Sequence, residues 1–196
     1  MGSCNTPLFK TNNMSCDITS GRLINCRDIQ GGIQAVYFCN FGDLGAITLT
    51  NDEVTDMAGS FSAYKFDVRS TGNSLEQAIT ASNESGTAFF EQTLSLSLPK
   101  LSKEDMVSFK LLTYGRPHCI VVDNNGNALL AGKDFGLSVS GGSITTSDSF
   151  GGMSGTTLTL SGSEKLPANF ISGAVAGNPF AGMSSATATV VVGTNS

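Results

Sequence analysis

His118 is the only histidine in the chain and the residue best suited to acid–base chemistry. An imidazole that acts as a general base needs a partner to orient it, and Asp123 and Glu91 are the carboxylates that could lie near it in space. His118 also follows Arg116-Pro117 at the start of an apolar run, where a histidine is more often a surface or packing residue. We therefore expect His118 to be a surface or packing residue.

Other catalytic signatures are missing from the sequence. It contains no nucleophile elbow, no Walker loop, no G-x-G-x-x-G and no H-E-x-x-H. We identify no catalytic and no cofactor-binding residue, and we predict that the protein is not an enzyme.

Asp52, Glu53 and Asp56 form the most acidic stretch, and carboxylates are the ligands that hard cations prefer. The stretch lacks the central glycine and the twelfth-position glutamate of a calcium-binding loop. The alternative, which we favour, is a solvated loop or helical turn between two strands.

The five cysteines could bind a metal or form disulfides: Cys4, Cys16, Cys26, Cys39 and Cys119. The first four are twelve, ten and thirteen positions apart, which does not match the paired C-x-x-C spacing of zinc sites. The odd count, and a start at Met1 without the pattern of a signal peptide, favour a reducing cytoplasm. We expect five unpaired thiols, no bound metal and no cofactor, with a structural zinc as the alternative.

The overall composition favours one mainly β domain. The chain has 196 residues, of which 14% are charged and 23 are glycine. We expect a single domain over residues 1–196 with an N-terminal arm at about 1–32. The net charge of −5 argues against stable binding to nucleic acid, because phosphate contacts need clusters of Lys and Arg. Residues 166–196 carry no charge, but Pro167 and Pro179 interrupt them, so we expect no membrane helix.

Residues 88–134 carry the clearest local signals. Leu94, Leu96 and Leu98 alternate with serines and predict a strand that ends at Pro99. Cys119–Asp123 and Ala128–Lys133 flank Asn124–Asn127, which contains the Asn-Gly pair typical of a hairpin turn.

A helix is predicted between the strand and the hairpin, over Ser102–Thr113. Ser102 is in place to cap it, and Gly115 follows as its C-cap. The predicted apolar face consists of Met106, Phe109, Leu112 and Thr113, widened by Val107 and Leu111.

The remaining strands are short and alternating. Ile33–Phe41 is apolar on both faces and should be central, and Phe61–Arg69 should turn Tyr64, Phe66 and Val68 inward. Further strands are predicted at Ala46–Thr50, Leu75–Ser82, Gly136–Ser140, Ile144–Thr146, Thr156–Ser161 and Ala186–Val192. Gly141-Gly142 should separate the two strands on either side of it. The apolar Ala186–Val192 strand would be prone to aggregate as a free edge, so we expect it to be covered.

Several strings resemble virion structural proteins of tailed bacteriophages, in particular tail tube or tail ring proteins of crAss-like phages and their relatives. The most specific are LLTYGRPH at 111–118, VVDNNGNALLAG at 121–132 and SEKLPANF at 163–170. The resemblance covers most of residues 17–172. It also includes the strings GGIQAVYF, DEVTDMAGSFSAYKF, TAFFEQTLSLSLPKL, GGSITTS and GTTLTLSG.

The resemblance implies a tail-tube-like fold, which is a β-sandwich or barrel with one flanking α-helix. It implies a structural subunit of the virion tail, made in the bacterial cytoplasm, that assembles into rings forming the DNA conduit. The expected partners are identical copies in a six-fold ring and other tail proteins, while DNA passes through without specific binding. The alternative is a ligand- or carbohydrate-binding β-sandwich, although Trp, a common residue in such sites, is absent.

Overall fold

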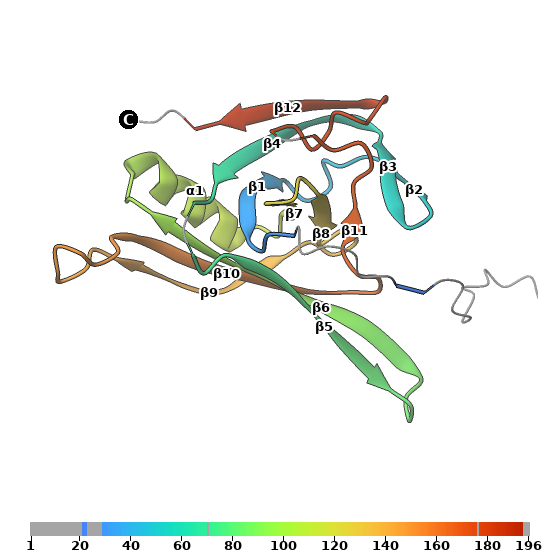
Figure 1. The fold of residues 1–196 in the computed structure, drawn as a ribbon, viewed down its shortest axis with the longest axis horizontal. Helices are drawn as coiled ribbons and strands as arrows, with labels where there is room; N and C mark the ends of the chain where they lie inside the picture. The colour runs from blue at the N-terminus through green and yellow to red at the C-terminus, as the bar shows by residue number, and fades with distance from the viewer. Residues whose placement is uncertain (1–20, 23–28, 70, 176, 194–196) are drawn as a thin grey trace, which may run out of the picture.

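A computed structural model describes residues 21–22, 29–69, 71–175 and 177–193, and most of the predicted N-terminal arm lies outside these residues. The described chain is mainly β, with three sheets and one helix (Figure 1). No helix in these ranges is long and apolar enough to cross a membrane. The elements are β1 Ile33–Cys39, β2 Ile47–Thr50, β3 Glu53–Met57, β4 Gly59–Asp67, β5 Ser74–Ser82, β6 Thr87–Pro99, α1 Lys103–Tyr114, β7 His118–Asp123, β8 Ala128–Ala131, β9 Ser138–Thr145, β10 Gly155–Glu164, β11 Asn169–Phe170 and β12 Ala186–Val192.

The six-stranded sheet has the order β11-β8-β7-β1-β4-β12. β1 lies in its interior, between β7 and β4, which confirms the prediction from its two apolar faces. Its pairings are antiparallel except at one edge, where β12 runs parallel to β4. The predicted hairpin over Asn124–Asn127 is confirmed as the connection between β7 and β8.

The four-stranded sheet has the order β5-β6-β10-β9 and is antiparallel throughout. The predicted break at Gly141-Gly142 is wrong, because β9 continues through both glycines. Glycine at 142 is needed for pairing rather than for a turn: a Cβ atom there would lie 2.5 Å from the Thr157 carbonyl oxygen of β10.

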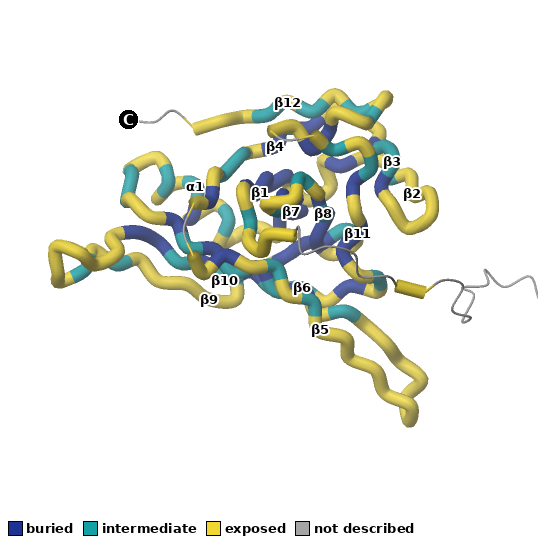
Figure 2. The backbone as a smooth tube through the Cα atoms, in the orientation of Figure 1, coloured by how far each residue is buried: buried dark blue, intermediate teal, exposed yellow. Residues whose placement is uncertain are grey.

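Two core clusters lie on opposite faces of the six-stranded sheet. The first includes Tyr37 and Cys39 and is closed by residues from β2, β3 and the segment before β12. The second includes Val36 and Phe38 and is shared with Leu94 and Leu160 of the four-stranded sheet. The two larger sheets therefore pack against each other across the second cluster, and the buried backbone concentrates there and in the first cluster (Figure 2).

The prediction for the orientation of β4 is only partly correct. Phe61 and Ala63 are the buried residues of the strand and belong to the first cluster. Phe66 and Val68 face the second cluster, as expected, but Tyr64 is exposed. The sequence pattern predicts one apolar face. The sheet has a core on each side, however, so the strand buries side chains on both of its faces.

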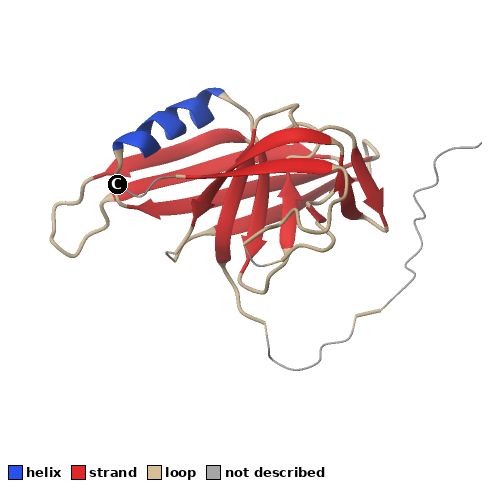
Figure 3. Ribbon diagram, turned by 90° about the horizontal axis from the view of Figure 1, so that it is seen from above, coloured by secondary structure: helices blue, strands red, loops and turns tan. Residues whose placement is uncertain are grey.

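The predicted helix is confirmed as α1. The Ser102 side chain accepts a hydrogen bond from the Asp105 backbone N–H at 3.1 Å, so the predicted N-cap is present. Gly115 is the C-cap but has extended rather than left-handed backbone. The predicted apolar face is too wide, because Phe109 is buried and Leu112 half-buried while Met106, Val107 and Leu111 are exposed. The helix packs at the end of the second cluster (Figure 3), where only one strip of its surface finds a partner.

Candidate functional site

Both ring nitrogens of His118 are engaged in hydrogen bonds inside the protein. Nδ1 lies 2.6 Å from the Gly132 carbonyl oxygen, which can only accept, so Nδ1 carries the proton. Nε2 then accepts from the Gly42 backbone N–H at 3.2 Å. The Phe41 ring stacks on the imidazole at 5.0 Å between centroids, with the Arg116 guanidinium 4.1 Å from the Phe41 centroid.

This arrangement agrees with the packing interpretation of His118, which is 4% exposed. Asp123 lies at the opposite end of β7 and accepts hydrogen bonds from Asn125 and Asn127. Glu91 is exposed on β6. The structure therefore brings neither of the two expected carboxylates to the imidazole.

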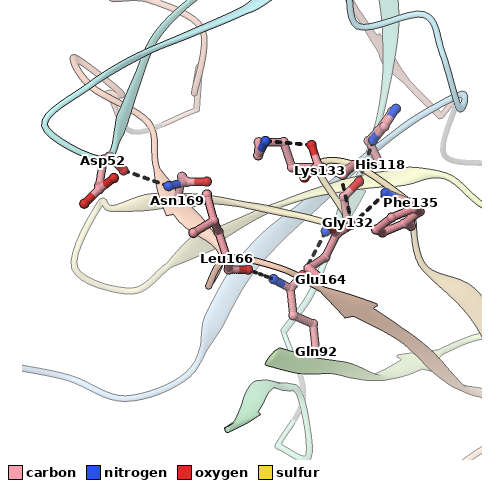
Figure 4. A network of polar contacts seen from close by, with 10 residues as sticks. Asp52, Gln92, His118, Gly132, Lys133, Phe135, Glu164, Leu166 and Asn169 are labelled. Atoms are coloured by element: carbon pink, nitrogen blue, oxygen red, sulfur yellow. Dashed lines mark hydrogen bonds and ion pairs between the residues drawn. The ribbon is translucent and has the colours of Figure 1, made fainter. Parts of the chain in front are cut away.

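Gln92, His118 and Glu164 together hold the loop that connects β8 to β9 (Figure 4). Gln92 Oε1 accepts from the Gly132 N–H at 2.8 Å, beside the His118 contact to the carbonyl of the same residue. Glu164 Oε1 accepts from the backbone N–H groups of Asp134 and Phe135, at 3.0 and 2.8 Å. Three buried polar side chains thus satisfy the backbone of one tight loop.

Gln92 and Glu164 are the site residues that the sequence interpretation missed. A signal was available, because each occupies a core-facing register position on its strand, in line with Leu94 on β6 and with Leu160 on β10. Glu164 is 3% exposed, and its Oε2 has no hydrogen-bond partner among the described residues. A carboxylate enclosed behind the backbone of the loop can position that loop but cannot reach a substrate in solvent.

The acidic stretch is a β-hairpin, so the expected loop or helical turn is wrong. Asn51 and Asp52 have φ values of 53° and 62°, as a two-residue primed turn between β2 and β3 requires. Asn and Asp tolerate this left-handed backbone better than other non-glycine residues. Within the described chain, no three His, Cys, Asp or Glu side chains gather in a metal-binding arrangement.

Asp56 connects this hairpin to the start of β12. Its carboxylate accepts from the Ser185 backbone N–H at 3.1 Å and from the Ser184 hydroxyl at 3.0 Å. Hydrogen bonding from Ser185 is the largest influence on the carboxyl group and lowers the pKa of Asp56, with partial desolvation opposing it. The group therefore remains an anion that anchors a loop.

Cys39 and Cys119 lie on adjacent strands but in different core clusters, on opposite faces of the sheet. Both thiols are free. Burial raises the pKa of Cys39 to about 12 and that of Cys119 well above its ordinary value. Because the thiolate is the reactive form, these two thiols should be inert in the folded protein.

Thiol titration tests this expectation. In a variant with Cys4, Cys16 and Cys26 replaced by serine, the native protein should show no rapidly reacting thiol, and denaturation should release two per chain. The natural chain, denatured without reductant, should show five free thiols. Fast labelling of Cys39 or Cys119 in the native state, a mass deficit of a disulfide, or stoichiometric zinc would contradict the prediction.

The outward face of the four-stranded sheet is mainly polar. Opposite the leucines, it presents the cross-strand pairs Thr93–Ser161, Ser95–Thr159 and Ser97–Thr157, all half-buried. The charged residues on this face are Glu76 and Glu91. Strands β5, β6, β9 and β10 contain no Lys or Arg. The face is therefore largely short-chained, hydroxyl-rich and mildly acidic, with Phe89, 37% exposed, as a large apolar side chain in the same register.

The sheets also end in unpaired edges. β5 and β9 form the two edges of the four-stranded sheet, and β12 forms an edge of the six-stranded sheet. None of the described residues pairs with the outer side of these strands, so the cover expected for β12 is not found within the described part of the chain. Each edge offers backbone N–H and C=O groups to another strand.

A hollow of about 730 Å³ adjoins Gln34, Arg69 and Asn124. None of the described residues that line it is aromatic. It therefore lacks the stacking platform expected of a carbohydrate site.

Comparisons of the chain with protein-family models, curated proteins and solved structures find no match.

Proposed function

We propose that this protein is a structural subunit of a bacteriophage virion, of the tail tube or tail ring type, whose copies assemble into rings that form a conduit for DNA. The proposed fold is a β-sandwich of the two larger sheets flanked by α1. The observation that carries the proposal is the outward face of the four-stranded sheet, which combines Ser, Thr and Glu side chains with an absence of Lys and Arg.

Such a face suits the wall of a DNA channel. Phosphates bind to proteins chiefly through Lys and Arg, so a wall without them gives passing DNA no point of attachment. Short hydroxyl side chains keep the wall smooth, and the carboxylates of Glu76 and Glu91 repel phosphate. The net charge of −5 has the matching sign.

The free edges provide a route to the ring. β9 of one copy would pair with β5 of the next, so that the four-stranded sheets join into one continuous wall. This pairing is heterologous, and rotation about a common axis closes it into a ring, for which we propose six copies. Closure removes the exposed edges of the four-stranded sheet.

Purified protein should form rings or short tubes in negative-stain micrographs. Deleting residues 2–16 should leave a folded protein by circular dichroism while weakening assembly, because the N-terminal arm is proposed to reach a neighbouring copy or ring. A full-length protein that stays monomeric at high concentration, and that contacts no copy of itself in isolated virions, would rule out the proposed function.

A further inference from the structure

The β5–β6 hairpin extends beyond the core while keeping an apolar inward face. The inward register of β6 runs from the buried Leu94 and Gln92 to Phe90 and Ala88, and Phe90 pairs with Ile79 of β5. Ile79 is 72% exposed. The end of this hairpin, residues 76–91, is here called the hairpin tip, and it projects from the body of the molecule (Figures 1 and 2).

A second unpartnered apolar strip lies on the outer face of α1. Val107, Leu111 and Tyr114 follow the spacing of one helical face, opposite the buried Phe109. They are 59%, 67% and 82% exposed. Lys103 lies four residues before Val107, and Lys110 lies three residues after Val107 and four before Tyr114, so both lysines border this strip.

The two surfaces carry complementary charges. The hairpin tip contains Glu76, Glu84 and Glu91 and no Lys or Arg. The strip on α1 is lined by two lysines, while Glu104 borders its other side. Glu76 and Glu91 lie in the outward register of the hairpin, opposite Ile79 and Phe90, and Glu84 lies in its turn, so the tip as a whole is negatively charged. A negatively charged tip favours contact with the lysine-bordered strip over contact with another tip.

The two surfaces cannot meet within one copy. α1 begins just after the end of β6, and the hairpin tip begins the same strand 13 residues earlier. Phe90 lies nine residues before Pro99, so at ~3.3 Å per residue β6 places it about 30 Å from the start of α1. The helical rise of α1 covers only about 18 Å, so α1 cannot reach Phe90 by folding back. Figure 1 shows them at opposite ends of the molecule.

We propose that the hairpin tip of one copy docks on the outer face of α1 in another copy, with Ile79 and Phe90 against Val107, Leu111 and Tyr114. The hairpin tip and the outer face of α1 lie at opposite ends of each subunit. The contact therefore repeats head to tail along the length of the strands. It rests on the proposed function in requiring self-association, and it adds that rings stack through this contact.

Cross-linking between two variants tests the contact directly. Both carry serine at Cys4, Cys16 and Cys26; one has Ile79→Cys and the other Leu111→Cys. A short bismaleimide should link the mixed variants into heterodimers. The matched control is Thr48→Cys, at an exposed position on β2, which should not link to either variant.

A pair of aspartate substitutions provides a second readout. Ile79→Asp should raise the protein concentration needed for tube formation at least about tenfold, because it places a charge in the apolar contact. Thr80→Asp, the next residue on the opposite face of β5, should leave that concentration within about twofold. If rings form normally, but the cross-link is absent and Ile79→Asp has no effect, the docking is overturned while the proposed function stays in place. A chain that never self-associates would overturn both.

Discussion

Replacing Phe109 with alanine is expected to lower the free energy of unfolding by about 3–5 kcal/mol. Phe109 is the one buried residue of α1 and is 6% exposed. Its ring lies 6.2 Å from that of Phe66, which in turn packs edge-on against Phe38 at 5.2 Å. Truncation removes the apolar area that attaches the helix and leaves a cavity at the end of the second core cluster.

Leu111→Ala, measured on the dissociated subunit, is the control, because Leu111 belongs to the same helix but is 67% exposed. Its effect should stay within about 0.5 kcal/mol. Chemical denaturation of both variants, followed by circular dichroism, compares their midpoints and slopes. Equal midpoints for Phe109→Ala and the natural protein would mean that α1 is not packed through this ring.

Elements with local chemical signals were predictable from the sequence. The Ser102 cap and a change of apolar period predict α1, and Asn-Gly between apolar runs predicts the β7–β8 hairpin. The β2–β3 hairpin has an equivalent signal in Asn51-Asp52, which tolerates the left-handed backbone of its turn. It was missed because three carboxylates suggested a solvated loop, although Val54 and Met57 are fully buried.

Long-range arrangements could not be predicted in the same way. Nothing local indicates that β12 runs parallel to β4, more than 100 residues earlier in the chain. Likewise, the sequence does not show that the strip of α1 facing the core is only as wide as Phe109 and Leu112. Both features depend on which elements share a sheet or a cluster, and this is decided by the packing of the whole chain.

The buried polar site was outside the reach of motif analysis for a related reason. Gln92 and Glu164 belong to no catalytic motif, and His118 is notable in the sequence only as the single imidazole. Their common role appears when β6, β7 and β10 bring them to the loop at residues 132–136. A polar residue at the core-facing position of an otherwise apolar strand is the sequence feature that predicts such a role.

That loop is expected to be sensitive to one added methyl group. Gly136 has a φ of 73°, and a Cβ atom there would collide with the Arg116 carbonyl oxygen and lie 3.0 Å from the Phe41 ring. Gly136→Ala combines about 1–2 kcal/mol of backbone strain with about 1–3 kcal/mol of overpacking. The free energy of unfolding should therefore fall by about 2–5 kcal/mol.

Gly126→Ala separates the two contributions, because Gly126 has a φ of 85° but no atom within 4 Å of its Cβ position. It should show only the strain, about 1–2 kcal/mol. The difference between the two variants in urea denaturation measures how tightly the loop is held against Arg116 and Phe41. If Gly136→Ala were no more destabilising than Gly126→Ala, the loop could move away without cost, and Gln92, His118 and Glu164 would not be fixing its position.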